Sequence, residues 1–549
     1  MKVAWVEFCT SNLGLDSLGH GRSLSSMKPT QAQCSVTRRR PKSKLQSVAT
    51  RVAKLLLPLV LTVPVVVNAQ FAYTTNDGTI TITGYPGSGG NVIIPETIDG
   101  LPVTSIGFWA FSDCNLTNIT IPDSVINIGS YAFYGCSDLT NVTIGTSVIS
   151  IGSSAFSTCY SLTSITIPDS VTSIEGYAFY GCTGLTRITV RALNAFYSSV
   201  DGVLFNKPQT TLIQYPGSKV GRYTIPDSVT SIGDYAFDGC GGLTSVTLSN
   251  SVTSIGSSAF SSCYGLTSIT IPDSVTNIGS AAFYYCSGLT NVTLGNRVTS
   301  IGDSAFSGCT SLTSITANAL NVLYSSVNGV LFNKNQTTLI LYPKGKVGSY
   351  TIPVSVTSIG GSTYYKTEGA FAGCTNLTSV TIGNGVTSIG DYAFDGCNSL
   401  TIVAIPTSVT NIGKDAFADC TSLTALTVNP ENRVYSDLDG VLFDQRLNRL
   451  IQFPGGLSIS YTIPGSVTNI RSGAFAGCTS LASVTIPGSV ASIDGGYYGG
   501  CGVFQGCASL TNVTIGNGVT SIDGGMSGGG GCVPRLHKPD QRYYSQQRH

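Results

Sequence analysis

The hydrophobic and polar positions of this chain follow one short pattern that returns many times. In a representative stretch, apolar residues stand at Leu162, Ile165 and Ile167, threonine and serine fill the positions between them, and Pro168 follows. This spacing predicts three inward-facing side chains and a short β-strand that alternates between its two sides. Because proline cannot donate a backbone hydrogen bond, it should end the strand.

The second half of the pattern predicts a shorter inward segment and a tight bend. After a polar turn, Val171 and Ile174 place two more apolar side chains on the inside. Gly176 permits the bend, after which Ala178 and Phe179 enter the core. One such coil cannot bury its apolar face alone, so we expect stacked coils whose strands pair in parallel.

A Phe-x-x-Cys motif marks thirteen copies of this unit. Apart from the hairpin-containing gaps described below, copies are 23 residues apart, with one step of 22 residues and one of 29, and a period of this length is typical of solenoid proteins. The motif residues are Phe111/Cys114, Phe133/Cys136, Phe156/Cys159, Phe179/Cys182, Phe237/Cys240, Phe260/Cys263, Phe283/Cys286, Phe306/Cys309, Phe371/Cys374, Phe394/Cys397, Phe417/Cys420, Phe475/Cys478 and Phe504/Cys507.

Three wider gaps between copies predict inserted β-hairpins. Two of the gaps are equal in length, and the third is longer because it includes an additional segment, 361–367. The inserts share the pattern Tyr-Ser-x-x-x-Gly-Val-Leu-Phe, which begins at Tyr197, Tyr324 and Tyr435. Asp-Gly or Asn-Gly between β-forming residues is a strong hairpin signal. The expected inserts lie near residues 191–225, 318–352 and 429–463.

The fold class that follows is a β-rich solenoid, a leucine-rich-repeat array of 23-residue coils with interspersed β-hairpin inserts. The repeat, typically Leu-Thr-Ser-Ile-Thr-Ile-Pro-Asp-Ser-Val-Thr-Ser-Ile-Gly-Asp-Tyr-Ala-Phe-Asp-Gly-Cys, resembles the BspA-type leucine-rich repeat of bacterial surface proteins over roughly residues 100–523. The insert pattern resembles the hairpin element found among those repeats. The resemblance implies an exported, often cell-surface protein, with some members acting as adhesins for host matrix or other cells. It carries over no catalytic residue.

The N-terminal segment, 1–69, has the features of an export signal. Eight Lys and Arg and no acid lie between Met27 and Lys54, and an apolar run, 55–67, broken by Pro58 and Pro64, follows. Small residues before Gln70 suit a signal peptidase, so the mature chain should start there, and Met27 is a plausible true start. The alternative is a membrane anchor, but the run is shorter than the roughly 20 residues that a spanning helix needs.

Charge and histidine content exclude several functions. Only 10% of residues are charged, and residues 70–531 carry 15 Lys and Arg against 25 Asp and Glu. An acidic body with scattered basic residues is a poor partner for nucleic acid or an anionic membrane. The three histidines are His20, His537 and His549, so residues 21–536 lack His-dependent catalytic triads and His-ligated metal sites. We expect no enzyme activity, metal or cofactor.

The repeated cysteines should be free thiols in the core. Thirteen of the 17 cysteines occupy the same position of the repeat, beside the phenylalanine. Neighbouring copies should stack about 4.8 Å apart, which is within disulfide reach, yet their side chains should all point inward. Buried free cysteine behaves as a small hydrophobe. Cys501 lies outside this column in a glycine-rich insert and is the better candidate for a reactive or cross-linking thiol.

Threonine fills the exposed strand position of almost every copy. The favoured interpretation is structural, because threonine suits a pleated surface and hydrogen-bonds along a ladder. The alternative is a hydroxyl-lined face for glycans or, if the face is flat, for ice. The column consists of Thr120, Thr143, Thr166, Thr189, Thr247, Thr270, Thr293, Thr316, Thr381, Thr427, Thr485 and Thr514, and Ala404 interrupts it.

Tyrosine supplies the candidate ligand-binding residues. Tyrosine occupies positions that other copies fill with Ser, Ala or Asp, so these positions should be exposed, and exposed tyrosine is typical of binding surfaces. Decoration of turns is the alternative. The candidates are Tyr131, Tyr134, Tyr177, Tyr180, Tyr235, Tyr284 and Tyr392. Asp437 and Asp439 resemble the start of a calcium loop, but the later ligands are lacking, which favours a hairpin turn.

The C-terminal segment, 532–549, differs from the repeat. The glycine-rich pattern of residues 494–504 begins again at Asp523, but a basic, histidine-containing tail replaces the expected Val-Phe-x-Gly-Cys. Permitted codons for this tail, shifted by one base, encode Val-Phe-Leu-Gly-Cys-Thr-Ser-Leu-Thr-Ser-Val-Thr-Ile, the missing repeat. We expect a frameshift, with a genuine basic tail as the alternative. The expected order is 1–69 as N-terminal extension and signal peptide, 70–100 as an N-terminal β segment or cap, 101–531 as the solenoid, and 532–549 as a non-native tail.

These observations predict a secreted or cell-surface, non-enzymatic recognition or adhesion protein. It should bind a protein or glycan ligand outside the cell through its repeat face. The alternative is a structural spacer or stalk of a larger cell-surface protein. We expect no nucleic-acid partner and no transmembrane segment in the mature chain.

Overall fold

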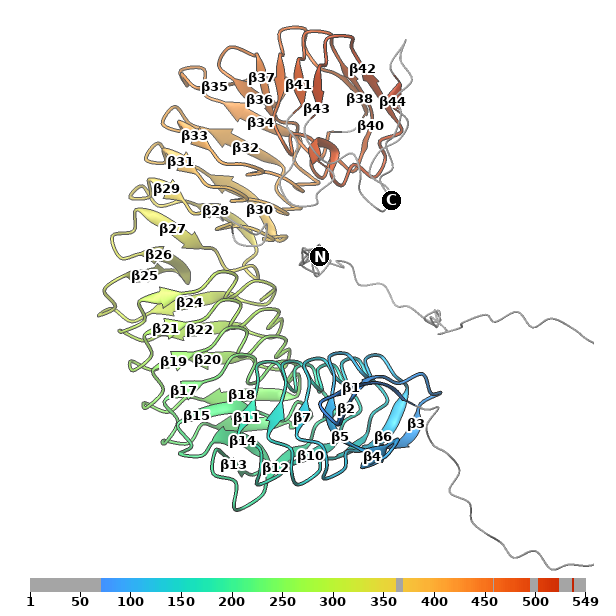
Figure 1. Cartoon of the computed structure of the whole chain (residues 1–549). Coiled ribbons are helices and arrows are strands. Elements are labelled where there is room, and N and C mark those ends of the chain that lie inside the picture. Colours follow the sequence, from blue (N-terminus) through green and yellow to red (C-terminus); the bar gives the residue numbers. More distant parts are fainter. Residues whose placement is uncertain (1–70, 362–368, 458, 494–501, 523–535, 538–549) are drawn as a thin grey trace, which may run out of the picture. The chain divides into compact units, whose positions relative to one another are not determined.

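The computed structural model describes residues 71–361, 369–457, 459–493, 502–522 and 536–537. All of them belong to one compact unit, Val66–His549. In this part of the chain the regular structure is β-strand, apart from one 3-10 turn, η3 (Gly502–Phe504). The coils stack one upon the next (Figure 1), so the predicted β-rich solenoid of 23-residue coils is confirmed.

Each coil contributes one strand to a main ladder of parallel strands. Ser164 pairs with Arg187 and Thr166 with Thr189, one repeat further along the chain. The ladder consists of β3 (Gly90–Ile93), β6 (Leu116–Thr120), β8 (Asn141–Thr143), β10 (Ser164–Ile167), β12 (Arg187–Val190), β16 (Gly221–Thr224), β18 (Leu243–Thr247), β20 (Ser268–Thr270), β22 (Asn291–Leu294), β24 (Ser314–Ala317), β28 (Gly348–Thr351), β30 (Leu377–Thr381), β32 (Ile402–Ile405), β34 (Ala425–Val428), β38 (Ile459–Thr462), β40 (Leu481–Ile486), β42 (Asn512–Ile515) and β44 (Leu536–His537).

A second, minor ladder is built from two-residue strands that also pair in parallel. Ser173 pairs with Ser150, and Ile174 with Ile151, and the isoleucines of the short strands from Ile128 to Ile493 pack in or against the core. The ladder consists of β7 (Asn127–Ile128), β9 (Ser150–Ile151), β11 (Ser173–Ile174), β17 (Ser231–Ile232), β19 (Ser254–Ile255), β21 (Asn277–Ile278), β23 (Ser300–Ile301), β29 (Ser358–Ile359), β31 (Ser388–Ile389), β33 (Asn411–Ile412), β39 (Asn469–Ile470), β41 (Ser492–Ile493) and β43 (Ser521–Ile522).

An antiparallel hairpin precedes the first coil. β1 (Ala72–Asn76) pairs with β2 (Thr79–Gly84), which pairs in parallel with β5 (Leu101–Ile106). β4 (Thr97–Ile98) lies against β5 in the antiparallel sense. Phe71 and Tyr85 pack on Phe111 with ring centroids 6.3 and 5.4 Å away, so they cover the first phenylalanine of the stack.

The three inserts are β-hairpins, as predicted. The turn between the first two strands of the first insert has positive φ at Asp201 and Gly202, 51° and 80°, which the Asp-Gly pair tolerates. A third strand then joins the minor ladder of the next coil. The strands are β13 (Tyr197–Val200), β14 (Val203–Asn206) and β15 (Thr211–Gln214), then β25 (Tyr324–Val327), β26 (Val330–Asn333) and β27 (Thr338–Leu341), and then β35 (Tyr435–Leu438), β36 (Val441–Asp444) and β37 (Arg449–Gln452).

The middle strand of each insert is apolar on both faces. In β14, Leu204 packs into the core of the preceding coils, whereas Val203 and Phe205 pack into the core of the following coils. The same division occurs in β26 and β36. A strand that is covered on both sides requires a continuous apolar run, which Val-Leu-Phe provides. The inserts therefore separate the apolar core into four clusters.

Phenylalanines stack along the interior of each cluster. The ring centroids of Phe133 and Phe156 are 5.2 Å apart and those of Phe260 and Phe283 are 5.3 Å apart, with nearly parallel planes. The expected inward positions are therefore confirmed. A turn begins at Gly176, as expected, and its left-handed residue is the next one, Tyr177, with φ of 64°.

Several predictions concern residues outside the described part of the chain. These are the export signal in residues 1–69, the thiol of Cys501, and most of residues 532–549. Of that tail, the structure describes Leu536 and His537, which form β44 beside β42. Among the described residues, no helix is long and apolar enough to cross a membrane.

Candidate functional site

The predicted tyrosines lie on the turn that closes each coil. In the turn sequence x-Ala-Phe-x the Ala and Phe side chains are buried, and we call the residue before Ala the first slot and the residue after Phe the second slot. Neighbouring turns are joined by backbone bonds: the Phe133 N–H donates to the Ala155 carbonyl oxygen at 2.8 Å. The slots of successive coils therefore form two columns, and we call this side of the solenoid the turn face.

The first slot has a left-handed backbone conformation in most coils, although Gly369, which holds this slot before Ala370, does not adopt it. Tyr131, Tyr235 and Tyr392 have φ of 58°, 58° and 55°, and Ser154 has φ of 55° in the same slot. This conformation is unfavourable for residues other than glycine, by roughly 1–2 kcal/mol. The chain keeps large aromatic side chains there despite that penalty.

The turn face is less exposed than the sequence predicted. Tyr177 is 48% exposed, whereas the other six candidate tyrosines are half-buried. Ser154 and Ser157, which occupy the two slots between the tyrosines of the neighbouring coils, are 6% and 1% exposed. The expectation that both slots are exposed is therefore wrong for these serines. Around Ser154 and Ser157, small side chains thus alternate with the tyrosines of the two neighbouring turns.

Three tyrosines meet across the first insert. The ring centroids of Tyr177 and Tyr235 are 4.4 Å apart, and Tyr180 lies edge-on to Tyr235 at 5.3 Å. A hydrogen bond to Tyr235, with burial and the nearby Asp234 adding to it, raises the pKa of Tyr177 to about 12. Burial, followed by the charge of Asp238, raises the pKa of Tyr180 to about 12. The hydroxyls of Tyr177 and Tyr180 therefore stay available as neutral hydrogen-bonding groups at physiological pH.

A second aromatic group surrounds Tyr131 and Tyr134 and includes two residues that the sequence reasoning missed. Phe108 and Trp109 are 62% and 56% exposed, and their rings stack at 5.2 Å. Both meet Tyr131 edge-on, at 5.5 and 5.9 Å, and Tyr131 lies 5.8 Å from Tyr134. Trp109 occupies the first slot of its coil, so the slot itself was the signal that would have identified it.

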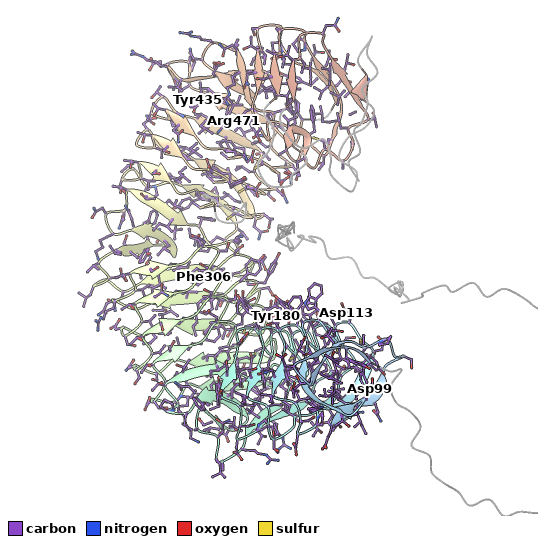
Figure 2. All side chains as sticks on the ribbon, in the orientation of Figure 1. Asp99, Asp113, Tyr180, Phe306, Tyr435 and Arg471 are labelled. Atoms are coloured by element: carbon purple, nitrogen blue, oxygen red, sulfur yellow. The ribbon has the colours of Figure 1, made fainter. Side chains whose placement is uncertain are left out.

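The two groups are neighbours on the turn face. Tyr131 contributes to the raised pKa of Tyr177, and Tyr134 contributes to the raised pKa of Tyr180, across the coil that holds the two buried serines. Figure 2 shows Asp113, in the first turn, and Tyr180 at the same edge of the N-terminal coils. We call the combined set the aromatic stripe. It consists of Phe108, Trp109, Tyr131, Tyr134, Tyr177, Tyr180 and Tyr235.

Tyr284 and Tyr392 are not part of the stripe. Tyr284 contacts Tyr285, with ring centroids 4.4 Å apart, and burial raises its pKa to about 12. Burial and the nearby Asp415 raise the pKa of Tyr392. Among the described residues, neither of the two has a ring contact with a tyrosine of the stripe. The structure therefore brings together five of the seven predicted tyrosines.

The cysteine column is buried and consists of free thiols, as predicted for the copies from Cys136 to Cys478. The Cys136 thiol donates to the Phe111 carbonyl oxygen at 3.0 Å, and Cys182 repeats this contact with Phe156 at the same distance. Burial raises the pKa of the Cys182 thiol to about 12. Cys114 and Cys507, near the two ends of the stack, are partly exposed. The described residues hold no group of three or more His, Cys, Asp and Glu that could bind a metal.

The threonine column of the main ladder is exposed, with Thr120 and Thr514 half-buried. Two other threonine columns donate to the preceding coil, as Thr163 does to the Thr140 carbonyl oxygen at 3.2 Å. A shallow groove of about 510 Å³ lies over Thr247, Thr270 and Thr293 of the exposed column. The glycan and ice interpretations of this face stay predictions.

The Asp437 segment is a hairpin turn, as predicted. Asp439 and Gly440 have φ of 53° and 79° between β35 and β36. The Asp437 carboxylate accepts a hydrogen bond from the Val428 N–H at 2.7 Å, which is the role that Ser199 and Ser326 play in the other inserts. The carboxylate therefore supports the hairpin.

Comparison with known proteins places these features among repeat proteins. A family model described as BspA type leucine rich repeat region, with six copies, matches residues 104–219, 214–336, 341–438 and 453–526. A leucine rich cell surface protein of Faecalibacterium prausnitzii is 30% identical, covering 82% of this chain and 94% of its own, with a TM-score of 0.34. A leucine-rich repeat protein of Bacteroides ovatus is 27% identical, covering 82% and 89%, with a TM-score of 0.31.

A third solved structure, the pneumococcal vaccine antigen PcpA, is 19% identical over 81% of this chain and 86% of its own, with a TM-score of 0.29. No curated protein gives a significant match.

Proposed function

The chain belongs to the BspA-type leucine-rich repeat family, and from that premise we propose that it is a non-enzymatic recognition or adhesion protein of the cell surface. In this proposal the chain is exported by its N-terminal segment and binds a protein or glycan ligand through its turn face. Family membership supports a surface protein with a role in molecular interaction. The aromatic stripe supports the choice of the turn face.

The observation that carries the proposal is the exposure of Phe108 and Trp109. Large aromatic side chains stabilise a fold when they are buried, and here the phenylalanines of the core provide that stabilisation. Trp109 is more than half exposed, in a left-handed conformation with φ of 56°. Aromatic side chains gathered on a surface are typical of binding sites, because they offer a large contact area and lose little conformational entropy.

The test is ligand capture by a variant that loses the stripe but keeps the turns. The full chain is presented to extracellular matrix proteins and to glycan arrays, beside a variant with Trp109→Ser, Tyr131→Ser, Tyr177→Ser and Tyr235→Ser. Serine already occupies the first slot at Ser154 with positive φ, so the variant turns keep their conformation. We expect capture to fall about tenfold or more, since central aromatic residues dominate the energy of most interfaces.

The matched control carries Tyr284→Ser and Tyr392→Ser, which lie outside the stripe, and should capture as well as the original chain. Circular dichroism should show the same β-rich spectrum for all three proteins. If capture survives all four substitutions of the test variant, the assignment to the turn face is wrong. A chain that captures no ligand in either screen would instead support the structural spacer.

A further inference from the structure

The first coils of the solenoid carry no positive charge. Residues 71–186 contain eight Asp and Glu and not one Lys or Arg, whereas residues 187–549 contain 18 acidic and 19 basic residues. The acidic character of the body is thus concentrated at one end. Without a cation of its own in this stretch, that end carries a net negative charge, of which Asp123 is influenced by Arg191 of the following segment.

Three of the acids are exposed on or beside the turn face. The Asp113 carboxylate accepts a hydrogen bond from the Ser112 hydroxyl at 3.1 Å and lies against Gly135, the residue after Tyr134. Asp138 and Glu175 are also exposed. The Glu175 carboxylate, two positions before Tyr177 in the chain, accepts a hydrogen bond from the Ser153 N–H at 2.9 Å. Asp113 and Glu175 therefore lie beside the aromatic stripe, and Asp138 follows Tyr134 by four positions in the chain.

Rings and carboxylates attract the same kind of charge. The face of an aromatic ring is negative, so a guanidinium or ammonium group binds above it, and a nearby carboxylate adds an ion pair. Arginine in particular can stack on a ring and pair with a carboxylate through its planar fork. Trp109 and Phe108 stack on each other through one face of each ring, and both residues remain more than half exposed for this contact.

We infer that the ligand of the aromatic stripe is a cationic protein segment, rich in Arg and Lys, which contacts the exposed rings and the flanking carboxylates together. This inference rests on the proposed function and names the class of partner for the same surface. A neutral glycan would gain nothing from the net negative charge of residues 71–186. Sulfated or acidic glycans, nucleic acids and anionic membranes would be repelled by it.

The test uses three probes of stated chemistry: a peptide of alternating Arg and Gly, a peptide of alternating Glu and Gly, and a neutral oligosaccharide. Binding to the full chain is measured at about 0.05 and 0.3 M salt, concentrations between which screening shortens the reach of exposed charges about twofold. We expect the Arg peptide to bind and to weaken about fivefold or more at high salt. The Glu peptide and the oligosaccharide should not bind detectably.

Charge neutralisation separates this inference from the proposed function. The triple variant Asp113→Asn, Asp138→Asn and Glu175→Gln keeps every ring of the stripe and should bind the Arg peptide about tenfold more weakly. The matched control neutralises three exposed acids of the charge-balanced region, Asp227→Asn, Asp273→Asn and Asp303→Asn. The control should bind within about twofold of the original chain, because the Debye length is only about 10 Å at 0.1 M salt.

Two outcomes overturn the inference. One is unchanged Arg-peptide binding by the triple variant, and the other is salt-independent binding of the neutral oligosaccharide. If capture of a matrix ligand needs the aromatic residues but ignores both salt and the triple variant, the inference fails and the proposed function stands. If capture ignores the aromatic residues as well, the proposed function fails with it.

Discussion

The cysteine of each repeat fills one position of the core and also donates a hydrogen bond there. Cys159 and Cys263 donate to the phenylalanine carbonyl oxygens of the preceding coils at 3.2 and 3.1 Å. Directly after an insert the geometry is looser, and Cys240 lies 3.9 Å from the Tyr215 oxygen. Because burial raises the pKa of these thiols, they remain protonated and can act as donors. A thiolate, the form that forms disulfides or binds metals, is disfavoured.

One residue of the turn face weakens the fold at neutral pH. Asp238 occupies a second slot, is 7% exposed, and accepts a hydrogen bond from Ser261. Burial raises the pKa of its carboxyl to about 6, although the serine bond acts in the opposite direction. The neighbouring coil holds Ser261 itself in this slot, so a small hydroxyl fits the space.

We expect Asp238→Ser to stabilise the protein above pH 6 and to leave it unchanged near pH 4. The folded state holds a proton that the unfolded chain releases between about pH 4 and pH 6, so the free energy of unfolding falls as pH rises through that window. The substitution removes this fall, which is worth about 1–3 kcal/mol. Thermal unfolding at pH 4, 5, 6 and 7.5 measures it.

The control for this prediction is Asp303→Ser, which changes an exposed carboxylate on the same face. The midpoint of thermal unfolding of this control should equal that of the original protein at every pH. A stabilisation by Asp238→Ser that is as large at pH 4 as at pH 7.5 would mean that packing, and not the buried charge, is responsible.

At the scale of the element, each insert is held by one buried asparagine. Asn321 is fully buried, and its amide nitrogen donates to the carbonyl oxygens of Gly295 and Val298 at 2.9 and 3.0 Å. Its amide oxygen accepts from the backbone N–H groups of Leu323 and Tyr324 at 2.9 and 2.8 Å. Asn194 and Asn432 make the same four contacts in the other inserts.

The tyrosine three residues after each asparagine also helps to hold the insert. The hydroxyls of Tyr197 and Tyr435 accept hydrogen bonds from the backbone N–H groups of Ile174 and Ile412, at 2.8 and 2.9 Å. In the third insert Arg471 also donates to the Ile412 carbonyl oxygen at 2.9 Å, and Figure 2 shows it close to Tyr435. These groups complete the backbone hydrogen bonds where the insert interrupts the minor ladder.

We expect Asn321→Ala to loosen the second insert. The substitution leaves four backbone groups without their partner, two of them in buried contacts and two in part-buried ones, which should cost about 3 kcal/mol or more. Hydrogen exchange of the amides in residues 318–341 should accelerate at least tenfold, because that free energy appears as local opening. Asn321→Asp keeps the acceptor oxygens and should have a smaller effect.

Asn291→Ala, at an exposed position of β22, serves as the control and should leave exchange unchanged. If the alanine at position 321 has no more effect than the alanine at position 291, the asparagine does not hold the insert.

The sequence was informative about single coils and less so about contacts between them. The regular period of the repeat determined which side chains face inward, and the Asp-Gly and Asn-Gly pairs located the hairpins. The buried asparagines share the spacing Asn-x-x-Tyr in all three inserts, a signal that was present but not used. The contact between Tyr177 and Tyr235 joins turns that an entire insert separates in the sequence. It depends on how that insert crosses the coil, which no local pattern encodes.

At the scale of the whole solenoid, the inserts determine where cooperativity should end. The short strands of the minor ladder are divided among four sheets, and each insert begins a new sheet. The four apolar clusters have the same boundaries, and the middle strand of each insert is shared between two clusters. In repeat proteins stability is the sum of local terms and nearest-neighbour interfaces, so a weaker interface divides the array.

We expect the array to unfold in segments that correspond to these clusters. Phe283 lies in the second cluster, fully buried and stacked on Phe260 and Phe306 at 5.3 and 5.4 Å. Phe283→Ala should cost about 3–5 kcal/mol of local stability through lost contacts and the cavity left behind. Because the affected contacts lie within one cluster, hydrogen exchange should accelerate in residues 203–331 and stay unchanged in 71–190 and 441–493. Thr293→Ala, an exposed change within the same cluster, should affect neither region. Uniform acceleration along the whole chain would show instead that the middle strands of the inserts couple the stability of neighbouring clusters fully. The solenoid would then unfold as one cooperative unit.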